Sequence, residues 1–243
     1  MEAYTKAHQE SKDEDKAVRE LNCLKTIFPR LFSKHRRNDL IVGRLDFLPI
    51  GFGSVTSIGG VGHYCVFHKL RAFKDTLKDE ELKKRVDVLY DYWQDNDVKS
   101  IYCQDVLNDT TTGRFIDCKY PFMATARLSG MMLDYKKLVR LGVNGLIDLI
   151  EKNESNTFME ACLKTMYLFK HVIRRQIELV KDAIEKTQDE QRLKDLHLMK
   201  EDLVYILDHK PATFHQALQL FWLYALCAGC INYGRMDIVL GHI

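Results

Sequence analysis

Hydrophobic residues recur at three- and four-residue steps through much of this chain, a spacing typical of amphipathic helices. The longest such pattern covers residues 157–208, where the polar letters KTQDE separate two apolar stripes. We predict an antiparallel helical hairpin here, packed inside a larger α-rich domain rather than in a coiled coil. The stripes consist of Met159, Leu163, Met166, Phe169, Ile173, Ile177, Val180 and Ile184, and of Leu193, Leu196, Met199, Leu203 and Ile206.

Other segments also have helical periodicity. Residues 15–34 and 79–95 each carry an apolar face, and the second segment opens on acidic residues that suit a helix N-terminus. Residues 133–152 indicate a helix, a glycine stop at Leu141-Gly142, and a second helix. Residues 1–15 are polar, and we expect them to be disordered.

Short extended segments are expected at two places. Leu40–Val42 precedes Gly43, and Ile238–Leu240 lies near the end of the sequence; both are apolar and short enough for buried strands. Between them, Gly51–Cys65 is glycine-rich, which lets the backbone approach another backbone or a ligand closely. This segment is not a phosphate-binding P-loop, because no Gly-Lys-Ser/Thr ends it, and it is not a dinucleotide fingerprint, because no alternating strand–helix pattern surrounds it. It is therefore either a structural loop or a loop that faces a pocket.

Composition narrows the class of protein. The formal charge of +2 gives no electrostatic reason to expect nucleic acid, and no apolar stretch is long enough to span a membrane. Seven scattered cysteines and the absence of a secretory signal favour a reducing, cytoplasmic location. Without a repeat or a low-complexity linker, residues 1–243 are interpreted as one domain.

Two clusters of residues are candidate binding sites. The basic stretch KHRRND, Lys34 to Asp39, is either a solvated helix end or a phosphate site. His63, Cys65 and His68 offer three ligand types for a metal but lack a fourth partner. We therefore predict no metal, with a packed cysteine and hydrogen-bonded histidines instead.

The last predicted helix begins at Pro211, which suits a first helical turn, and ends at Gly229, with Gly234 in the turn that follows. An adjacent stripe holds His215, Gln219 and Trp222. The expected apolar face of this helix contains Phe214, Ala217, Leu218, Phe221, Tyr224 and Leu226.

The letters of this region, P-x-T-F-x-x-A-L-Q-L-F-W followed by G-R-x-D, resemble the glycyl radical enzymes of the pyruvate formate-lyase-like family. A D-x-I-V-G phrase at Asp39–Gly43 resembles the same family, as does a third stretch containing Gly130, Asp134, Tyr135, Leu138, Gly142, Gly145 and Leu146. The resemblance implies a predominantly α-helical segment of the family's α/β barrel, with few short strands. Residues 1–243 would then be the N-terminal part of a pyruvate formate-lyase-like domain.

The third stretch departs from the family at substrate-facing positions. Dehydratase-type members often place a histidine after the first glycine, where this chain has Met131; members acting on pyruvate use an arginine nearby, and the nearest here is Arg127. Met131 is either a core methionine or a pocket residue, and His63, Arg127 and Met131 are the candidate pocket residues. Arg235 and Asp237 are interpreted as structural, fixing the turn after the last helix.

The resemblance also implies radical chemistry. In the family, a radical S-adenosylmethionine activase installs a glycyl radical, which passes to a cysteine that abstracts hydrogen from a small organic substrate, in lyase or formate acetyltransferase-like reactions. The family's Gly-Cys-x-Glu and R-V-x-G phrases are not in this chain, and Cys227 and Cys230 lack a thioredoxin context. We therefore assign no catalytic residue and expect the chain alone to be inactive.

Two interpretations follow. The chain is either a truncated N-terminal part of a glycyl radical enzyme or a non-catalytic helical interaction domain derived from that family. Its expected partners are the remainder of the barrel or a second copy of itself, with an activase for a full-length form. An in-frame continuation after codon 243 that encodes the two radical phrases would favour the first interpretation.

Overall fold

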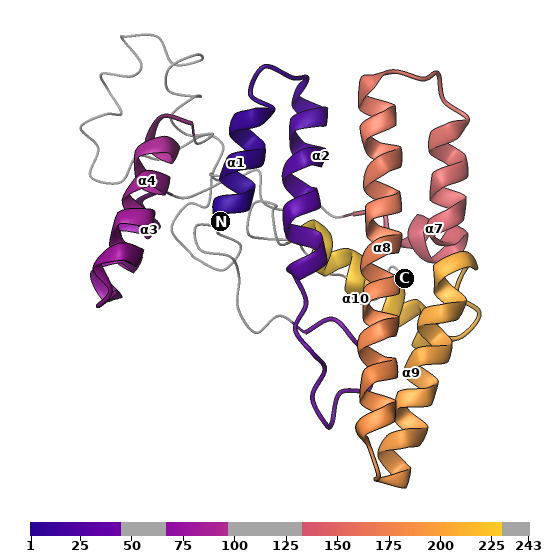
Figure 1. Ribbon diagram of the computed structural model, residues 1–243. Coiled ribbons are helices and arrows are strands. Elements are labelled where there is room, and N and C mark those ends of the chain that lie inside the picture. The colour runs from indigo at the N-terminus through magenta and orange to yellow at the C-terminus, as the bar shows by residue number, and fades with distance from the viewer. Residues whose placement is uncertain (45–66, 97–132, 230–243) are drawn as a thin grey trace. The chain divides into compact units, whose positions relative to one another are not determined.

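A computed structural model describes residues 1–44, 67–96 and 133–229 (Figure 1). Within these ranges every regular element is a helix, and the one β-type contact is an isolated antiparallel bridge between Ser33 and Arg44. The elements are α1 (Glu2–Glu10), α2 (Lys16–Ile27), the 3-10 turn η1 (Phe28–Arg30), α3 (Phe67–Thr76), α4 (Glu80–Asn96), α7 (Tyr135–Glu151), α8 (Thr157–Lys186), α9 (Glu190–Asp208) and α10 (Phe214–Gly229).

The chain divides into two compact units, and each is described by itself. The first contains α3 and α4; the second contains α2, η1, α7, α8, α9 and nearly all of α1 and α10. The expectation that residues 1–243 form one domain stays a prediction.

The described part of the first unit is a helical pair, α3 and α4. Lys74 of α3 donates to both carboxylate oxygens of Asp87 on α4, at 2.6 and 2.7 Å. Leu70 and Trp93 are fully buried. The helix predicted over residues 79–95 is confirmed by α4, although Leu82, expected on its apolar face, is 37% exposed.

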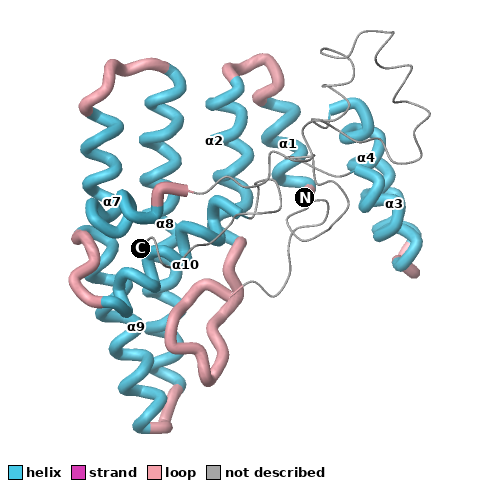
Figure 2. The backbone as a smooth tube through the Cα atoms, turned by 180° about the vertical axis from the view of Figure 1, so that it is seen from behind, coloured by secondary structure: helices cyan, strands magenta, loops and turns pink. Residues whose placement is uncertain are grey.

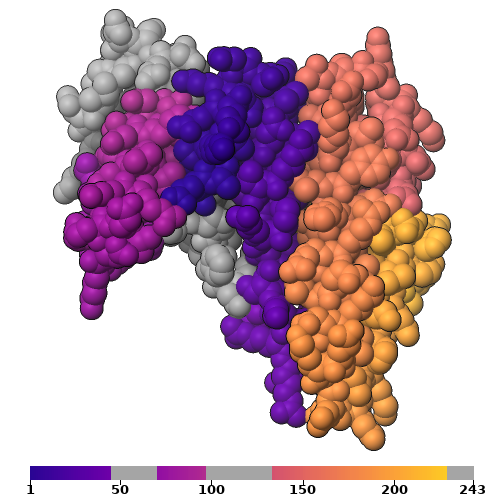
Figure 3. All heavy atoms as spheres, in the orientation of Figure 1, coloured from indigo at the N-terminus to yellow at the C-terminus, as the bar shows by residue number. Residues whose placement is uncertain are grey.

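The second unit is built on the α8–α9 hairpin, which confirms the hairpin predicted from residues 157–208. Asn156 caps α8 by accepting from the Met159 amide, and Asp189 caps α9 by accepting from the Arg192 amide. The helices run side by side (Figures 1 and 2). In the space-filling view, the indigo atoms of α2 lie directly against the orange atoms of α8 (Figure 3). The predicted stripes supply much of the buried surface: Met166, Phe169, Ile173, Ile177 and Val180 on α8, and Leu196, Met199, Leu203 and Ile206 on α9.

The glycine stop predicted in residues 133–152 is confirmed. Gly142 has φ 69° and ψ −178°, so α7 consists of two helical halves joined at a kink. Buried Lys170 of α8 fixes the kinked region, because its ammonium donates to Asn144 at 2.9 Å and to Asp208 at 2.8 Å. This ammonium also lowers the pKa of the Asp208 carboxyl.

The expectation of disorder over residues 1–15 is wrong for the segment that forms α1. Polar residues dominate this helix, yet its Tyr4, Thr5 and His8 are buried. The neighbouring α2 supplies polar partners: its Cys23 forms a side-chain hydrogen bond with Tyr4, and its Asn22 amide donates to the hydroxyl of Ser11, directly after α1, at 3.3 Å. A polar helix that buries hydrogen-bonding side chains has no apolar stripe, so periodicity does not reveal it.

Acid should selectively weaken the packing of α1. Burial lowers the pKa of His8 to about 4 from an ordinary 6.5, so the unfolded chain binds this proton more readily than the folded one. His8 therefore contributes stability that is present above pH 6.5 and lost as the pH falls to about 4. We expect this contribution to be about 3 kcal/mol. Urea unfolding at several pH values checks it.

His8→Gln should remove the pH dependence of this contribution, and His171→Gln, at an exposed position on α8, should not. An equal pH profile for His8→Gln and the wild-type chain would contradict the assignment.

The helix predicted over residues 15–34 is shorter than expected. Asp15 caps α2 by accepting from the Ala17 amide at 2.8 Å, and α2 ends at Ile27. Pro29 then lacks the N–H that a continuing α-helix needs, so the chain tightens into η1.

Leu40–Val42 is not a strand. Leu40 is 58% exposed, whereas Val42 is 1% exposed. The Val42 peptide group pairs with the side chain of Gln219 on α10 instead of with a neighbouring strand. The second expected strand, Ile238–Leu240, lies outside the described residues.

The last predicted helix is present as α10, but it begins at Phe214 rather than at Pro211, and its buried face differs from the expected one. Phe214 is 83% exposed, whereas Gln219, from the stripe regarded as adjacent, is 1% exposed. Apolar residues surround α10 on nearly every side, so sequence periodicity does not select the face that the core covers. The buried residues are Gln216, Gln219, Leu220, Phe221, Leu223, Ala225 and Cys227.

None of the helices described is both long enough and apolar enough to cross a lipid bilayer.

Candidate functional site

The main polar assembly of the second unit holds an irregular loop, residues 33–44, against α9 and α10. The bridge between the Ser33 amide and the Arg44 carbonyl, at 2.9 Å, closes this loop at its base. The loop contains both the basic stretch and the D-x-I-V-G phrase noted in the sequence. We call the contacts that hold it, made by Arg192, Asp39, Arg44, Gln219 and Trp222, the loop clamp.

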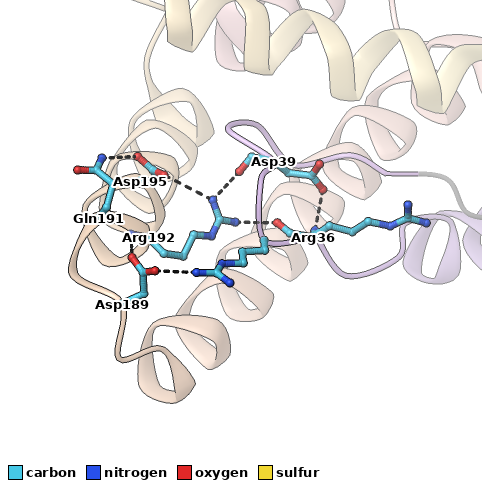
Figure 4. A network of polar contacts seen from close by, with 7 residues as sticks. Arg36, Asp39, Asp189, Gln191, Arg192 and Asp195 are labelled. Atoms are coloured by element: carbon cyan, nitrogen blue, oxygen red, sulfur yellow. Dashed lines mark hydrogen bonds and ion pairs between the residues drawn. The ribbon is translucent and has the colours of Figure 1, made fainter.

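Arg192 ties the loop to the start of α9. Its guanidinium donates to the carbonyl oxygens of Asp39 at 2.7 Å and Arg36 at 3.0 Å, and its side chain is 8% exposed. Figure 4 shows this guanidinium lying between the α9 side chains and the loop, with the carboxylate of Asp195 at 3.9 Å. A buried guanidinium with several fixed acceptors holds both peptide groups in place.

Asp39 organises the loop from within. Its carboxylate accepts from the Arg36 amide at 2.7 Å and from two nitrogens of Arg44, at 2.6 and 3.0 Å. The bonded Arg44 guanidinium is the main reason that the pKa of Asp39 lies below its ordinary value. The carboxylate therefore stays ionised and paired, which suits a structural role rather than proton transfer.

Two side chains of α10 complete the clamp. The Gln219 carboxamide accepts from the Val42 amide at 2.8 Å and donates to the Val42 carbonyl at 3.1 Å. The indole N–H of Trp222 donates to the Gly43 carbonyl at 2.9 Å. Gly43 has φ 109°, and a Cβ there would lie 2.8 Å from the Trp222 ring, so the D-x-I-V-G phrase needs its glycine where it meets α10.

These contacts join two sequence phrases that resemble one family, although 177 residues separate Val42 from Gln219. Sequence reasoning identified both phrases but did not predict that they touch. It also missed Arg192, whose signal is its position four residues before Leu196, on the same helical stripe as the buried residues of α9.

Arg192→Lys should lower the free energy of unfolding by about 1–3 kcal/mol, because an ammonium cannot reproduce the forked donation to two loop carbonyls. Arg37→Gln is the matched control: Arg37 lies in the same loop, but its ion pair with Asp189 is exposed and should contribute less than about 1 kcal/mol. Denaturant unfolding checks both, and equal losses would contradict the role given to Arg192.

A pocket of about 330 Å³ lies beside the clamp, with walls that include Ile41, Trp222 and Leu226. Its charged residues, Asp39 and Arg44, bind each other. The pocket therefore presents apolar surface rather than a free acid or base.

The candidate pocket residues His63, Arg127 and Met131 lie outside the described residues, as do Arg235 and Asp237. The structure therefore does not test their assigned roles. The same holds for the metal prediction, since the side chains of His63, Cys65 and His68 are not described. In the described ranges, no group of three or more histidine, cysteine, aspartate or glutamate side chains is arranged to hold a metal.

One further acid–base pair lies in the second unit. The Nδ1 of His215, at the start of α10, bonds to the carboxylate of Asp202 on α9, and Asp202 is 3% exposed. The contact joins two consecutive helices and fits a role in their packing.

Comparison with known proteins identifies the class. The sequence matches the family model described as pyruvate formate lyase-like over residues 1–243. The chain belongs to this family, as the sequence phrases predicted. The (2S)-3-sulfopropanediol dehydratase of Klebsiella oxytoca is 27% identical, in a match covering 66% of this chain and 22% of that protein.

Solved structures share the fold. The B12-independent glycerol dehydratase from Clostridium butyricum, bound to glycerol, superposes with a TM-score of 0.72 at 19% identity, covering 96% of this chain and 31% of that one. A glycyl radical enzyme from Archaeoglobus fulgidus gives a TM-score of 0.73 at 19% identity, over 94% of this chain and 31% of that one. A Roseburia inulinivorans structure described for 1,2-propanediol dehydration gives 0.73 at 18% identity, with the same coverage.

The chain thus spans about a third of the length of these structures and less of the curated relative. The prediction of a helical segment with a glycyl radical enzyme fold is confirmed within the described residues. The few strands expected at Leu40–Val42 are not found there, and the α/β barrel stays a proposal.

Proposed function

We propose that this chain is the helical part of a glycyl radical lyase that acts on a small organic substrate by breaking a carbon–oxygen bond. The family match supports radical lyase chemistry in general, and the dehydratase names of its relatives favour this reaction class over carbon–carbon cleavage. The methionine at position 131, where dehydratases often place a histidine, leaves the particular substrate open.

The loop clamp is the observation that carries the proposed role of the described helices. It fixes the D-x-I-V-G phrase on α10 through peptide groups, so the backbone leaving Gly43 has a defined position and direction. Its polar side chains are engaged with loop backbone or, in the case of Asp39 and Arg44, also with each other. We infer that these helices position the segments that build the pocket and do not themselves perform chemistry.

The radical is assigned to no residue of this chain. The family stores it on a glycine in an R-V-x-G-like phrase, and no glycine here stands in one. No cysteine here stands in the Gly-Cys-x-Glu-like phrase that transfers the radical, and the described cysteines, Cys23, Cys162 and Cys227, are wholly or partly buried. Burial raises the pKa of the Cys23 thiol to about 12, which favours an inert core role in a reducing cytoplasm.

The proposed partners are the remainder of a barrel, or a second copy of this chain, and a radical S-adenosylmethionine activase for the longer form. Large exposed apolar side chains on the second unit support association. Phe158 is 60% exposed at the start of α8, Tyr167 is 48% exposed further along it, and Phe214 is 83% exposed at the start of α10.

The chain alone should not acquire a radical, because it has no glycine for an activase to oxidise. We expect no glycyl doublet in electron paramagnetic resonance after anaerobic incubation with an activase, S-adenosylmethionine and reductant. A glycyl radical dehydratase with its own activase serves as the positive control.

A glycyl doublet on the 243-residue chain would overturn this proposal. A second arm adds a polypeptide that carries both radical phrases. Substrate turnover in the mixture supports the enzyme role, whereas stable binding without a radical or turnover supports the alternative, a non-catalytic helical interaction domain.

A further inference from the structure

We draw no further inference here: the strongest candidate, the apolar pocket of about 330 Å³ that Ile41, Trp222 and Leu226 line beside the loop clamp, belongs to the site already described, and nothing in the part of the chain that the structure describes shows what covers it.

Discussion

Replacing Gly142 by alanine is expected to lower the free energy of unfolding of the second unit by about 3 kcal/mol or more. The backbone at Gly142 has φ 69° and ψ −178°, a region that residues with a Cβ atom rarely occupy. A Cβ atom here would also lie 2.8 Å from the Cα and 3.0 Å from the amide nitrogen of Lys210. Both neighbours belong to backbone, so neither can swing aside as a side-chain end does.

Urea unfolding of the variant checks this, with Lys136→Ala at an exposed position on α7 as the control, expected within about 0.5 kcal/mol of wild type. Gly142→Asn separates the causes further. Asparagine tolerates the left-handed helical region but not this value of ψ, so it should not restore stability. Wild-type stability of Gly142→Ala would mean that the kink does not need this conformation.

Gln219→Leu is expected to lower the free energy of unfolding by about 2–4 kcal/mol. Leucine keeps the size of the side chain but leaves both the amide and the carbonyl of Val42 without a partner. Val42 and Gln219 are each 1% exposed, so water does not replace the lost bonds without disturbing the core. Gln191→Leu, at an exposed position on α9, is the control and should change stability by less than about 0.5 kcal/mol.

Gln219→Glu gives a pH-dependent version of the same test. Protonated glutamic acid can accept from the Val42 amide and donate to its carbonyl, as glutamine does; the carboxylate cannot donate. Burial raises the folded-state pKa of such a group above its ordinary value of about 4.3, so this variant should lose stability as the pH rises from about 4 to 7. A deficit relative to wild type that is equal at both pH values would contradict the two-bond geometry.

The clamp shows what residues of the family-like phrases do in the structure. Gly43 lacks a side chain where the Trp222 ring approaches, and Gln219 replaces a strand partner for Val42. A loop held through its peptide groups accepts changes in its own side chains as long as the holding residues remain.

The sequence by itself determined the local elements whose pattern repeats along the chain. The α8–α9 hairpin follows from uninterrupted apolar stripes, and the break at Gly142 follows from a residue that permits a positive φ. Both depend on residues within a few turns of one another, so no distant contact was needed to predict them. The resemblance to the family likewise depends only on the order of residues within short stretches of the sequence.

Tertiary structure decided which helix faces are buried and which side chains bond to the backbone groups of the loop. The buried face of α10 depends on what covers a helix that is apolar almost all round, and Leu40–Val42 became a clamped loop because Gln219, far along the chain, supplies both hydrogen bonds. The helix α1 has no apolar stripe, and α2 provides hydrogen bonds to its buried Tyr4 and to Ser11 directly after it. In the sequence, Arg192 is one of several charged residues on α9. Its role in the clamp depends on the loop that lies beside it and whose carbonyl oxygens it binds. In each case the deciding interaction joins residues distant in sequence, and local periodicity carries no information about them.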